Sequence, residues 1–348
     1  MTISPALRVF AWLSFLAEVI IIGTGGAVRL TGSGLGCNQW PLCTPESLIP
    51  TQELGIHGLI EFGNRTMTGA VGIIALLVLL FALAAAGGRR AVIPAVIFAV
   101  GGVVIAAASY VVFSMLDLGS VGAVVMSVIL LLAVIVGATF SLMTTPVRRD
   151  LLTLAWVVLA GVMVQAVVGG SAVLTGLNPF IVGFHYASSL ALVCVTAAFI
   201  ARMNAVPGPR ELATPKWYMI LTHVTSLVLA VTIAFGVLTT ASGPHSGDAN
   251  VQRNGFDASI LAHVHSWPGY TLFALAMVLV IPAWLKNLPT RPWATTFIGV
   301  LVVQIIVGVI QARDALPPLL VGIHMVLAAL SAAAYVLIVL RLKRPVTA

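Results

Sequence analysis

The chain has 348 residues, of which 60% are hydrophobic and 8% are charged, and its formal net charge is +7. A soluble domain carries roughly 25% charged residues, so this composition excludes an ordinary soluble protein. The positive charge does not indicate binding to nucleic acid, because the basic residues stand in alternate short segments between apolar runs, as orientation in a membrane requires.

Ten apolar runs are predicted to be transmembrane helices, because each is long enough to cross ~30 Å of hydrocarbon. Their predicted ranges are 8–29, 55–86, 91–115, 120–144, 151–174, 180–202, 217–240, 259–285, 293–312 and 318–342. A cleaved signal peptide is not expected, since the first run is long and many others follow it.

The basic residues orient these helices. They concentrate in one set of alternate segments, at Arg8, Arg89, Arg90, Arg148, Arg149, Arg202, Arg210, Lys216, Lys286, Arg291, Arg341, Lys343 and Arg344. The opposite segments, which contain few basic residues, are 30–54, 116–119, 175–179, 241–258 and 313–317. The positive-inside rule therefore predicts that both termini are cytoplasmic. We expect a multi-pass protein of the cell membrane, in contact with lipid, whose long outer loops are irregular segments outside the hydrocarbon.

The chain contains an internal repeat. Gln165–Gly169 resembles Gln304–Gly308, and a His follows each Gln by 20 residues, at His185 and His324. A second pair of similar segments, each of which opens a long outer loop, is Thr31–Gly34 and Thr240–Gly243. The repeat predicts an all-α integral membrane fold of two pseudo-symmetric four-helix bundles.

One half of the repeat is longer than the other. Gln165 and Gln304 are 139 residues apart, whereas Asn64 and His265, which occupy equivalent positions, are 201 residues apart. The difference of 62 residues matches the apolar hairpin at about 91–150. We interpret this hairpin as an inserted transmembrane hairpin that packs on the periphery. The predicted domains are 1–202, which includes the hairpin, and 217–348.

Three His residues lie at a similar depth near the predicted outer ends of their helices. His185, His265 and His324 are roughly 4–10 residues from those ends, or about 6–15 Å at 1.5 Å per residue. Ionisable groups inside a bilayer usually face a bundle interior and have a function, and imidazole is an axial ligand of heme iron. The repeat pairs His265 with His324, so these two are predicted to bind a heme between them. The alternative is that the His residues make only interhelical hydrogen bonds.

The first half has a different polar set on its second helix. His57, Glu61 and Asn64 are at positions i, i+4 and i+7, so they share one helix face, which we expect to face His185. Glu61 is a candidate for positioning water, relaying protons or stabilising a cationic intermediate. The alternative is a buried ion pair of Glu61 with His57 or Arg65 that only fixes packing. Because Asn is a poor iron ligand, Asn64 predicts an open or exchangeable site, which suits a substrate.

Two Cys and two Arg residues lie near the predicted outer surface. Cys37 and Cys43 stand in the first outer loop, on an oxidising side that is compatible with a disulfide, and their spacing leaves open whether such a bond is redox-active or structural. Arg29 and Arg65 lie at the outer ends of helices, where they are candidates for pairing with heme propionates. The alternative for both Arg residues is snorkelling to the membrane surface.

These segments resemble the heme A synthase family. The strongest similarity is Gly25–Cys43, whose sequence is GGAVRLTGSGLGCNQWPLC. The other similar segments, in the family's order, are Ile60–Arg65, Gln165–Gly169, Phe184–His185 and Ile323–His324. The resemblance covers nearly the whole chain except the hairpin.

The resemblance implies a membrane oxidoreductase that oxidises the C8 methyl group of heme O to a formyl group through a hydroxylated intermediate. It implies that His265 and His324 ligate the iron of a bound heme b. It also implies that Glu61 and His185 serve the substrate site, with His185 as a ligand or contact of the substrate iron. His57 is expected to pair with Glu61 or to contact the heme edge.

The resemblance also implies a setting for the reaction. Cys37 and Cys43 would form a disulfide linked to activity, and the active sites would lie toward the extracytoplasmic side. The isoprenoid tail of heme O suits a site that opens sideways to lipid. The implied partners are heme O synthase and cytochrome c oxidase assembly proteins, while a homo-oligomer is left open.

Two departures from the family keep other functions open. Many members have His where this chain has Asn64, and the family usually has eight helices rather than ten. One alternative is a di-heme, b-type electron-transfer cytochrome, which Asn64 opposes. The other is a heme carrier or transporter without catalysis, which would not require Glu61 or the two Cys residues.

Overall fold

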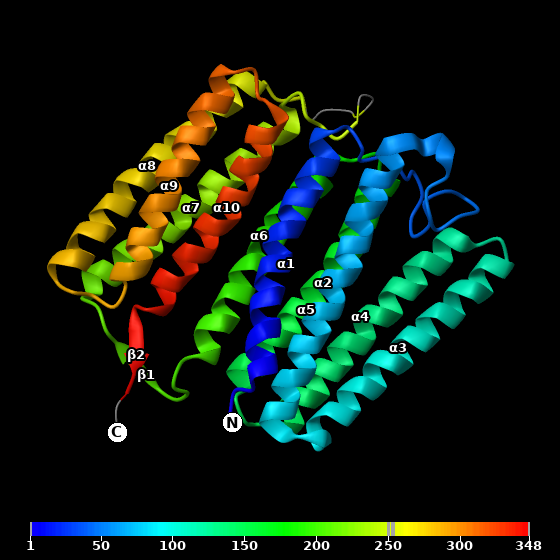
Figure 1. Cartoon of the computed structure of the whole chain (residues 1–348), viewed down its shortest axis with the longest axis horizontal. Helices are drawn as coiled ribbons and strands as arrows, with labels where there is room; N and C mark the ends of the chain where they lie inside the picture. The colour runs from blue at the N-terminus through cyan, green and yellow to red at the C-terminus, as the bar shows by residue number, and fades with distance from the viewer. Residues whose placement is uncertain (1, 249–250, 252–254, 347–348) are drawn as a thin grey trace.

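The computed structural model describes residues 2–248, 251 and 255–346. Within these ranges, ten helices are long and apolar enough to cross a membrane (Figure 1). They are α1 (Pro5–Leu30), α2 (Gly55–Gly87), α3 (Arg89–Met115), α4 (Gly119–Thr144), α5 (Arg149–Leu174), α6 (Pro179–Met203), α7 (Lys216–Ser242), α8 (Ala258–Leu285), α9 (Arg291–Arg313) and α10 (Pro318–Leu340). The shorter elements are η1 (Gln52–Leu54), β1 (Arg210–Leu212) and β2 (Lys343–Pro345). The prediction of an all-helical, multi-pass membrane protein is confirmed.

Local sequence signals explain several helix boundaries. Ser4, Asn178 and Asp257 accept hydrogen bonds from backbone N–H groups in the first turns of α1, α6 and α8, which satisfies donors that a helix leaves unpaired. The hydrogen bonds that Asp257 accepts from the Ser259 side chain and from first-turn N–H groups lower the pKa of its carboxyl group. Gly88, whose φ is 60°, separates α2 from α3, because this conformation favours Gly.

The bundle has two chemically different ends. At one end, which we call the basic end, Arg148 donates to Asp150 and to the carbonyl of Arg202, and β1 pairs with β2 in antiparallel register. Both described chain ends lie here (Figure 1). At the opposite end, which we call the loop end, the segments after Leu30 and Ser242 carry the long connections.

The helices form two groups of four and a peripheral hairpin. Helices α1, α2, α5 and α6 contact one another, as do α7, α8, α9 and α10, and the groups meet through α1, α6, α7 and α10. The α3–α4 hairpin packs on α2 and α5 at one edge of the molecule (Figure 1). Such association depends on close packing, since the lipid is as apolar as the helix surfaces.

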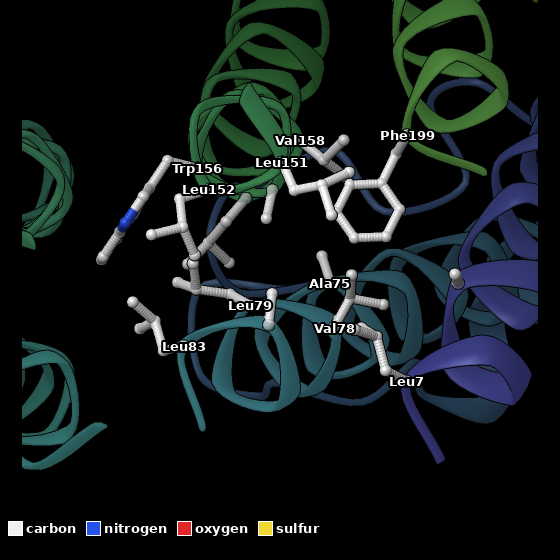
Figure 2. Close-up of a cluster of buried hydrophobic side chains, with 14 of the residues drawn as sticks. Leu7, Ala75, Val78, Leu79, Leu83, Leu151, Leu152, Trp156, Val158 and Phe199 are labelled. Atoms are coloured by element: carbon white, nitrogen blue, oxygen red, sulfur yellow. The ribbon is translucent and has the colours of Figure 1, made fainter. Parts of the chain in front are cut away.

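Each contact region has its own apolar cluster. The largest cluster joins α1, α2, α5 and α6 toward the basic end, where Leu7, Leu79, Leu151 and Phe199 are buried against one another (Figure 2). A second cluster, which includes Phe297, lies within α7–α10. A third joins the two groups and contains Ile22, Val193, Met325 and Ala329. These apolar clusters occupy the basic-end and central parts of the bundle, which leaves space for cavities toward the loop end.

Candidate functional site

His265 and His324 each lie against a glycine of the preceding helix. A Cβ atom at Gly236 of α7 would be 2.9 Å from Cε1 of His265, and a Cβ atom at Gly308 of α9 would be 3.0 Å from Cε1 of His324. Both distances are shorter than ordinary van der Waals contact. Glycine therefore allows each ring to approach the neighbouring helix more closely than any other residue would.

The first half repeats this arrangement with looser contacts. A Cβ atom at Gly169 of α5 would be 3.4 Å from Cε1 of His185, and one at Gly25 of α1 would be 3.9 Å from Oδ1 of Asn64. In four helix pairs, a polar side chain thus faces a glycine of the preceding long helix in its group. Sequence reasoning did not assign Gly25 or Gly236 to either site, although a glycine on the helix before each polar residue was a readable signal.

The rings of His265 and His324 lie close together and both line one cavity. Their ring centres are 6.2 Å apart and their planes are 80° apart. Two imidazoles on one metal ion have ring centres about 6 Å apart, given a metal–nitrogen distance of about 2.0 Å and roughly 1.1 Å from nitrogen to ring centre. The spacing of the two rings therefore fits a shared iron, and the cavity that they line is bordered by residues of α6, α7, α8, α9 and α10.

Hydrogen bonding prepares His265 as a ligand. Its Nδ1 is 3.0 Å from the backbone carbonyl of Thr232, one turn before Gly236. Because a carbonyl only accepts, Nδ1 carries the hydrogen, and Nε2 of the neutral ring keeps its lone pair. Nδ1 of His324, by contrast, is buried and has no hydrogen-bond partner among the described residues. The ring of His265 is thereby oriented by the helix on which it rests.

A second cavity, which we call the first-half cavity, brings together most of the residues predicted for the other site. Its outer part, of about 1050 Å³, is lined by Glu61, Asn64, Arg65, Gln165 and His185. Its inner part, of about 750 Å³, shares Asn64, Gln165 and His185 and continues toward the middle of the bundle. Nδ1 of His185 is buried and has no hydrogen-bond partner among the described residues. The ring can therefore serve a group that enters this cavity.

His57 takes a different place from the other predicted residues. Its Nδ1 is 2.9 Å from Oγ of Ser33, in the loop after α1, and its side chain is exposed. His57 is not one of the described residues that line the first-half cavity, in either its outer or its inner part. The backbone of His57 also lies directly beneath Gly36, where a Cβ atom would be 2.3 Å from the carbonyl oxygen. His57 therefore connects α2 to the loop, one turn above Glu61.

Glu61 and Arg65 fasten the first loop to α2. One carboxylate oxygen of Glu61 accepts from the backbone N–H of Cys37, at 2.6 Å, and the other accepts from Nη2 of Arg65, at 2.5 Å. Arg65 also donates to the carbonyls of Cys37, Gln39 and Leu42, at 2.8–3.0 Å. The ion pair that the sequence offered as an alternative is present, and Glu61 also faces the first-half cavity.

The fastened loop contains a disulfide between Cys37 and Cys43. Both Cys residues are fully buried. The loop sends Trp40 against Gly170 of α5, where a Cβ atom would be 2.4 Å from the indole ring. The loop with its disulfide is therefore a roof over the first-half cavity, held on one side by Arg65 and on the other by the contact of Trp40 with α5.

Gln165 joins α5 to α6 below the ring of His185. Its Nε2 donates to Oγ of Ser188, at 2.6 Å, and its Oε1 accepts from Oγ of Ser189, at 3.2 Å. Ser189 also donates to the carbonyl of His185, at 2.8 Å. This network holds the turn of α6 that carries His185, which gives the repeated Gln a positioning role in the first half.

Arg29 stands on the boundary between the two groups of helices. Its Nε donates to the carbonyl of His245, at 2.6 Å, and its Nη2 donates to the carbonyl of Thr240, at 2.5 Å. It lines the cavity of His265 and His324 and both parts of the first-half cavity. Its positive charge is therefore available to an anionic group in either cavity.

Glu18 is a buried carboxyl group that sequence reasoning missed. It lies in the inner part of the first-half cavity, and 2% of its surface is exposed. The readable signal was that it is the only acidic residue in the first apolar run, at 8–29, because ionisable groups inside a membrane are usually functional.

An apolar groove opens beside the first-half cavity, and we call it the lateral groove. It holds about 670 Å³ and lies between α4 and α5. Its lining consists of Trp40, Met126, Ser127, Val128, Leu130, Leu131, Met163, Val164, Ala166, Val167 and Val168. Trp40 and Ala166 line both this groove and the first-half cavity. The α3–α4 hairpin therefore supplies one wall of an apolar pocket next to the candidate site.

Comparisons with known proteins point in one direction. A family model described as cytochrome oxidase assembly protein (COX15-CtaA) matches residues 8–124 and 121–337. A protein of Exiguobacterium sibiricum named "Heme A synthase" is 38% identical over 80 residues, which is 23% of this chain and 26% of that protein. Proteins with the same name from Alkalihalophilus pseudofirmus and Bacillus cereus are 34% identical over 77 residues and 38% identical over 71 residues, covering 22% and 19% of this chain and 25% and 22% of theirs. The chain thus matches about a quarter of the length of these curated relatives.

Proposed function

The chain belongs to the cytochrome oxidase assembly protein family, and from that membership we propose that it is a heme A synthase, which oxidises the C8 methyl group of heme O to a formyl group. The observation that carries the proposal is the presence of two cavities that share Arg29, one lined by His265 and His324 and one lined by His185 and Asn64. This asymmetry suits one resident heme and one heme that is exchanged.

His265 and His324 would hold a resident heme b. The fit rests on their ring separation of 6.2 Å and on the carbonyl of Thr232 that orients His265. A bound heme would supply electron transfer to an acceptor, which no side chain in this cavity can perform. The residues of the chain would set its position and keep water away from its face.

The first-half cavity would receive heme O. His185 offers one ring nitrogen. Asn64 takes the position that corresponds to His265 in the other half, and its Oδ1 already accepts from Oγ1 of Thr24, at 2.8 Å. With a single strong ligand, the substrate can leave after reaction. Arg29 would attract the propionates from the boundary of the cavity. The tail of heme O would leave the cavity through the lateral groove, past Trp40, into an apolar environment.

Glu61 would orient water and receive protons at the loop end of this cavity. Arg65 and the N–H of Cys37 hold its carboxylate in a fixed direction, so little reorganisation is needed when charge develops nearby. Oxidation of a methyl group releases protons as well as electrons, so a fixed carboxylate beside the cavity is useful. The roof loop with its disulfide would exclude bulk water from the same place.

The membrane setting and the partners follow from this function. The Lys and Arg residues of the basic end support a cytoplasmic location for that end, in the cell membrane, with both cavities toward the extracytoplasmic side. We expect heme O synthase to deliver the substrate and cytochrome c oxidase assembly proteins to receive the product.

The test is co-expression with heme O synthase, followed by extraction and analysis of the hemes. The proposal expects heme A and a hydroxylated intermediate in addition to b-type heme. His324→Ala and His265→Ala should abolish the stable b-type spectrum, whereas His223→Ala, an exposed His on the basic-end part of α7, should retain it. Two stable b-type hemes without heme A would support an electron-transfer cytochrome. Bound heme O that is never converted would support a carrier.

A further inference from the structure

Glu18 lies deep inside the membrane-spanning part of α1. It is twelve residues before the helix end at Leu30, or about 18 Å along the axis, and therefore near the middle of a bilayer. The residue is 2% exposed, and it lines the inner part of the first-half cavity together with Asn64, Gln165 and His185. Its side chain therefore faces the inner part of the first-half cavity and not the lipid.

No group around Glu18 neutralises a negative charge at close range. Its Oε1 is buried and has no hydrogen-bond partner among the described residues. The other residues that line the inner cavity include Asn64 and Thr68 from α2, Gln165 from α5 and Met325 from α10, none of which is charged.

The titratable and cationic residues of the inner cavity all lie nearer the loop end. They are Arg29 of α1, which donates to two backbone carbonyls and keeps its positive charge, and His185 and Tyr186 of α6. A carboxylate in such a place is costly unless it gains a partner. Glu18 is thus a carboxyl group whose charge depends on what enters the cavity.

Polar groups continue from Glu18 toward the basic end. Ser14, one turn earlier on α1, is buried, and its Oγ has no partner among the described residues. Ser14 and Thr196 line a small cavity between α1, α2, α5 and α6, with room for about one water molecule. Water that enters either cavity would find hydrogen-bonding partners there, and buried water requires such partners.

The inner cavity also borders the cavity of His265 and His324. Arg29, Tyr186 and Met325 line both. Because the two cavities share these residues, a change of charge in either cavity acts on Glu18 through the interior of the bundle, where electrostatic interactions are stronger than in bulk water. Among the described residues, Glu18 is the carboxyl group that lines the inner cavity.

We propose that Glu18 is a proton-exchange residue, which rests in its protonated form and releases or regains one proton as charge changes in the two cavities. In the release step, the O–H bond of the carboxyl group breaks and a new O–H bond forms on a water molecule in the inner cavity. No electron moves at Glu18, and the reverse step restores the acid. The inference rests on the proposed function, because heme oxidation is what changes the charge.

The first test is infrared difference spectroscopy of the purified, heme-loaded protein on electrochemical reduction, in H₂O and in D₂O. We expect a carbonyl band of a protonated carboxyl group that shifts in D₂O. Glu18→Gln should remove the band, while Glu53→Gln, at an exposed carboxylate in η1, should leave it. A band that persists in Glu18→Gln overturns the proposal.

The second test is the yield of heme A on co-expression with heme O synthase. Glu18→Gln keeps the shape and polarity but cannot exchange a proton, so the yield should fall about tenfold or more, whereas Glu18→Asp should keep most of it. Ser141→Ala, at another buried hydroxyl without a partner in α4, controls for packing. Equal yields in Glu18→Gln and the unaltered protein overturn the proposal.

The two tests also separate this inference from the proposed function. If the unaltered protein makes no heme A, the proposed function fails, while the infrared band still decides whether Glu18 exchanges a proton. If Glu18→Gln does not retain heme b, Glu18→Asp replaces it in the spectra. The carboxyl band should then shift in frequency, and an unshifted band contradicts the assignment.

Discussion

The contact between Gly308 and His324 allows a sharp test of how the imidazole pair is positioned. The Cβ atom added by Gly308→Ala would be 3.0 Å from Cε1 of His324, and ordinary contact begins at 3.4 Å, so the ring must move by about 0.4 Å. Gly299 lies on the same helix, and a Cβ atom there meets nothing within 4 Å. The two substitutions are chemically identical and differ only in what the new methyl group touches.

The energies of the two substitutions have opposite signs. Ala is favoured over Gly in a helix interior by about 0.8–1 kcal/mol, so Gly299→Ala should be neutral or stabilising. Overpacking costs about 1–3 kcal/mol, so Gly308→Ala should lose up to about 2 kcal/mol after the helical gain is subtracted. Changes in the residues that orient a ligand lower metal affinity about 10–100-fold. We therefore expect heme b to bind at least about tenfold more weakly in Gly308→Ala.

The assay is titration of the purified apoprotein with heme b, followed by absorbance, together with thermal unfolding of both variants. A lower affinity in Gly308→Ala, with unchanged affinity in Gly299→Ala, supports the argument. Equal heme affinity in the two variants would refute the reasoning that glycine seats the His324 ring.

Three further predictions concern the first half. Arg65→Lys removes the planar guanidinium that donates to three loop carbonyls and to Glu61, so the free energy of unfolding should fall by at least about 1.5 kcal/mol. The roof loop should also be cleaved faster in limited proteolysis, and unchanged cleavage would contradict this role. Val128→Trp fills the lateral groove and should weaken binding of heme O but not of heme b. Val104→Trp, at an exposed position of α3 outside the groove, should affect neither, and equal effects of Val128→Trp on both hemes would count against the groove. Asn64→His supplies a second imidazole, so purified protein should retain more heme per chain, and an unchanged ratio would argue against the position of Asn64 beside the substrate.

The charge and hydropathy patterns predicted the architecture well. Only helices or closed barrels can span a bilayer, because every backbone polar group must be satisfied within the protein, and long apolar runs therefore become helices. The predicted ranges, such as 120–144 and 318–342, differ from α4 and α10 by at most two residues at either end. The family resemblance was equally readable, because motifs such as Gly25–Cys43 are contiguous in the chain.

Side-chain directions were harder to predict. Helical spacing placed His57 and Glu61 on one face, and the structure turns His57 to Ser33 and Glu61 to Cys37. The roof loop causes this difference, because it covers the first turn of α2 and offers partners there. A loop that folds back over a helix end is not encoded in helical periodicity.

The sequence by itself determined the number of spans, their alternating direction and the polar residues that recur near one end, since each depends on composition along a single stretch of chain. Only the tertiary structure decided that Glu18 faces a cavity, that glycines seat the imidazoles and that the hairpin walls the lateral groove. These helices are apolar on nearly every face, so hydrophobic periodicity does not reveal how each is rotated. Rotation is set by packing against neighbours that are distant in the chain, which no local pattern contains.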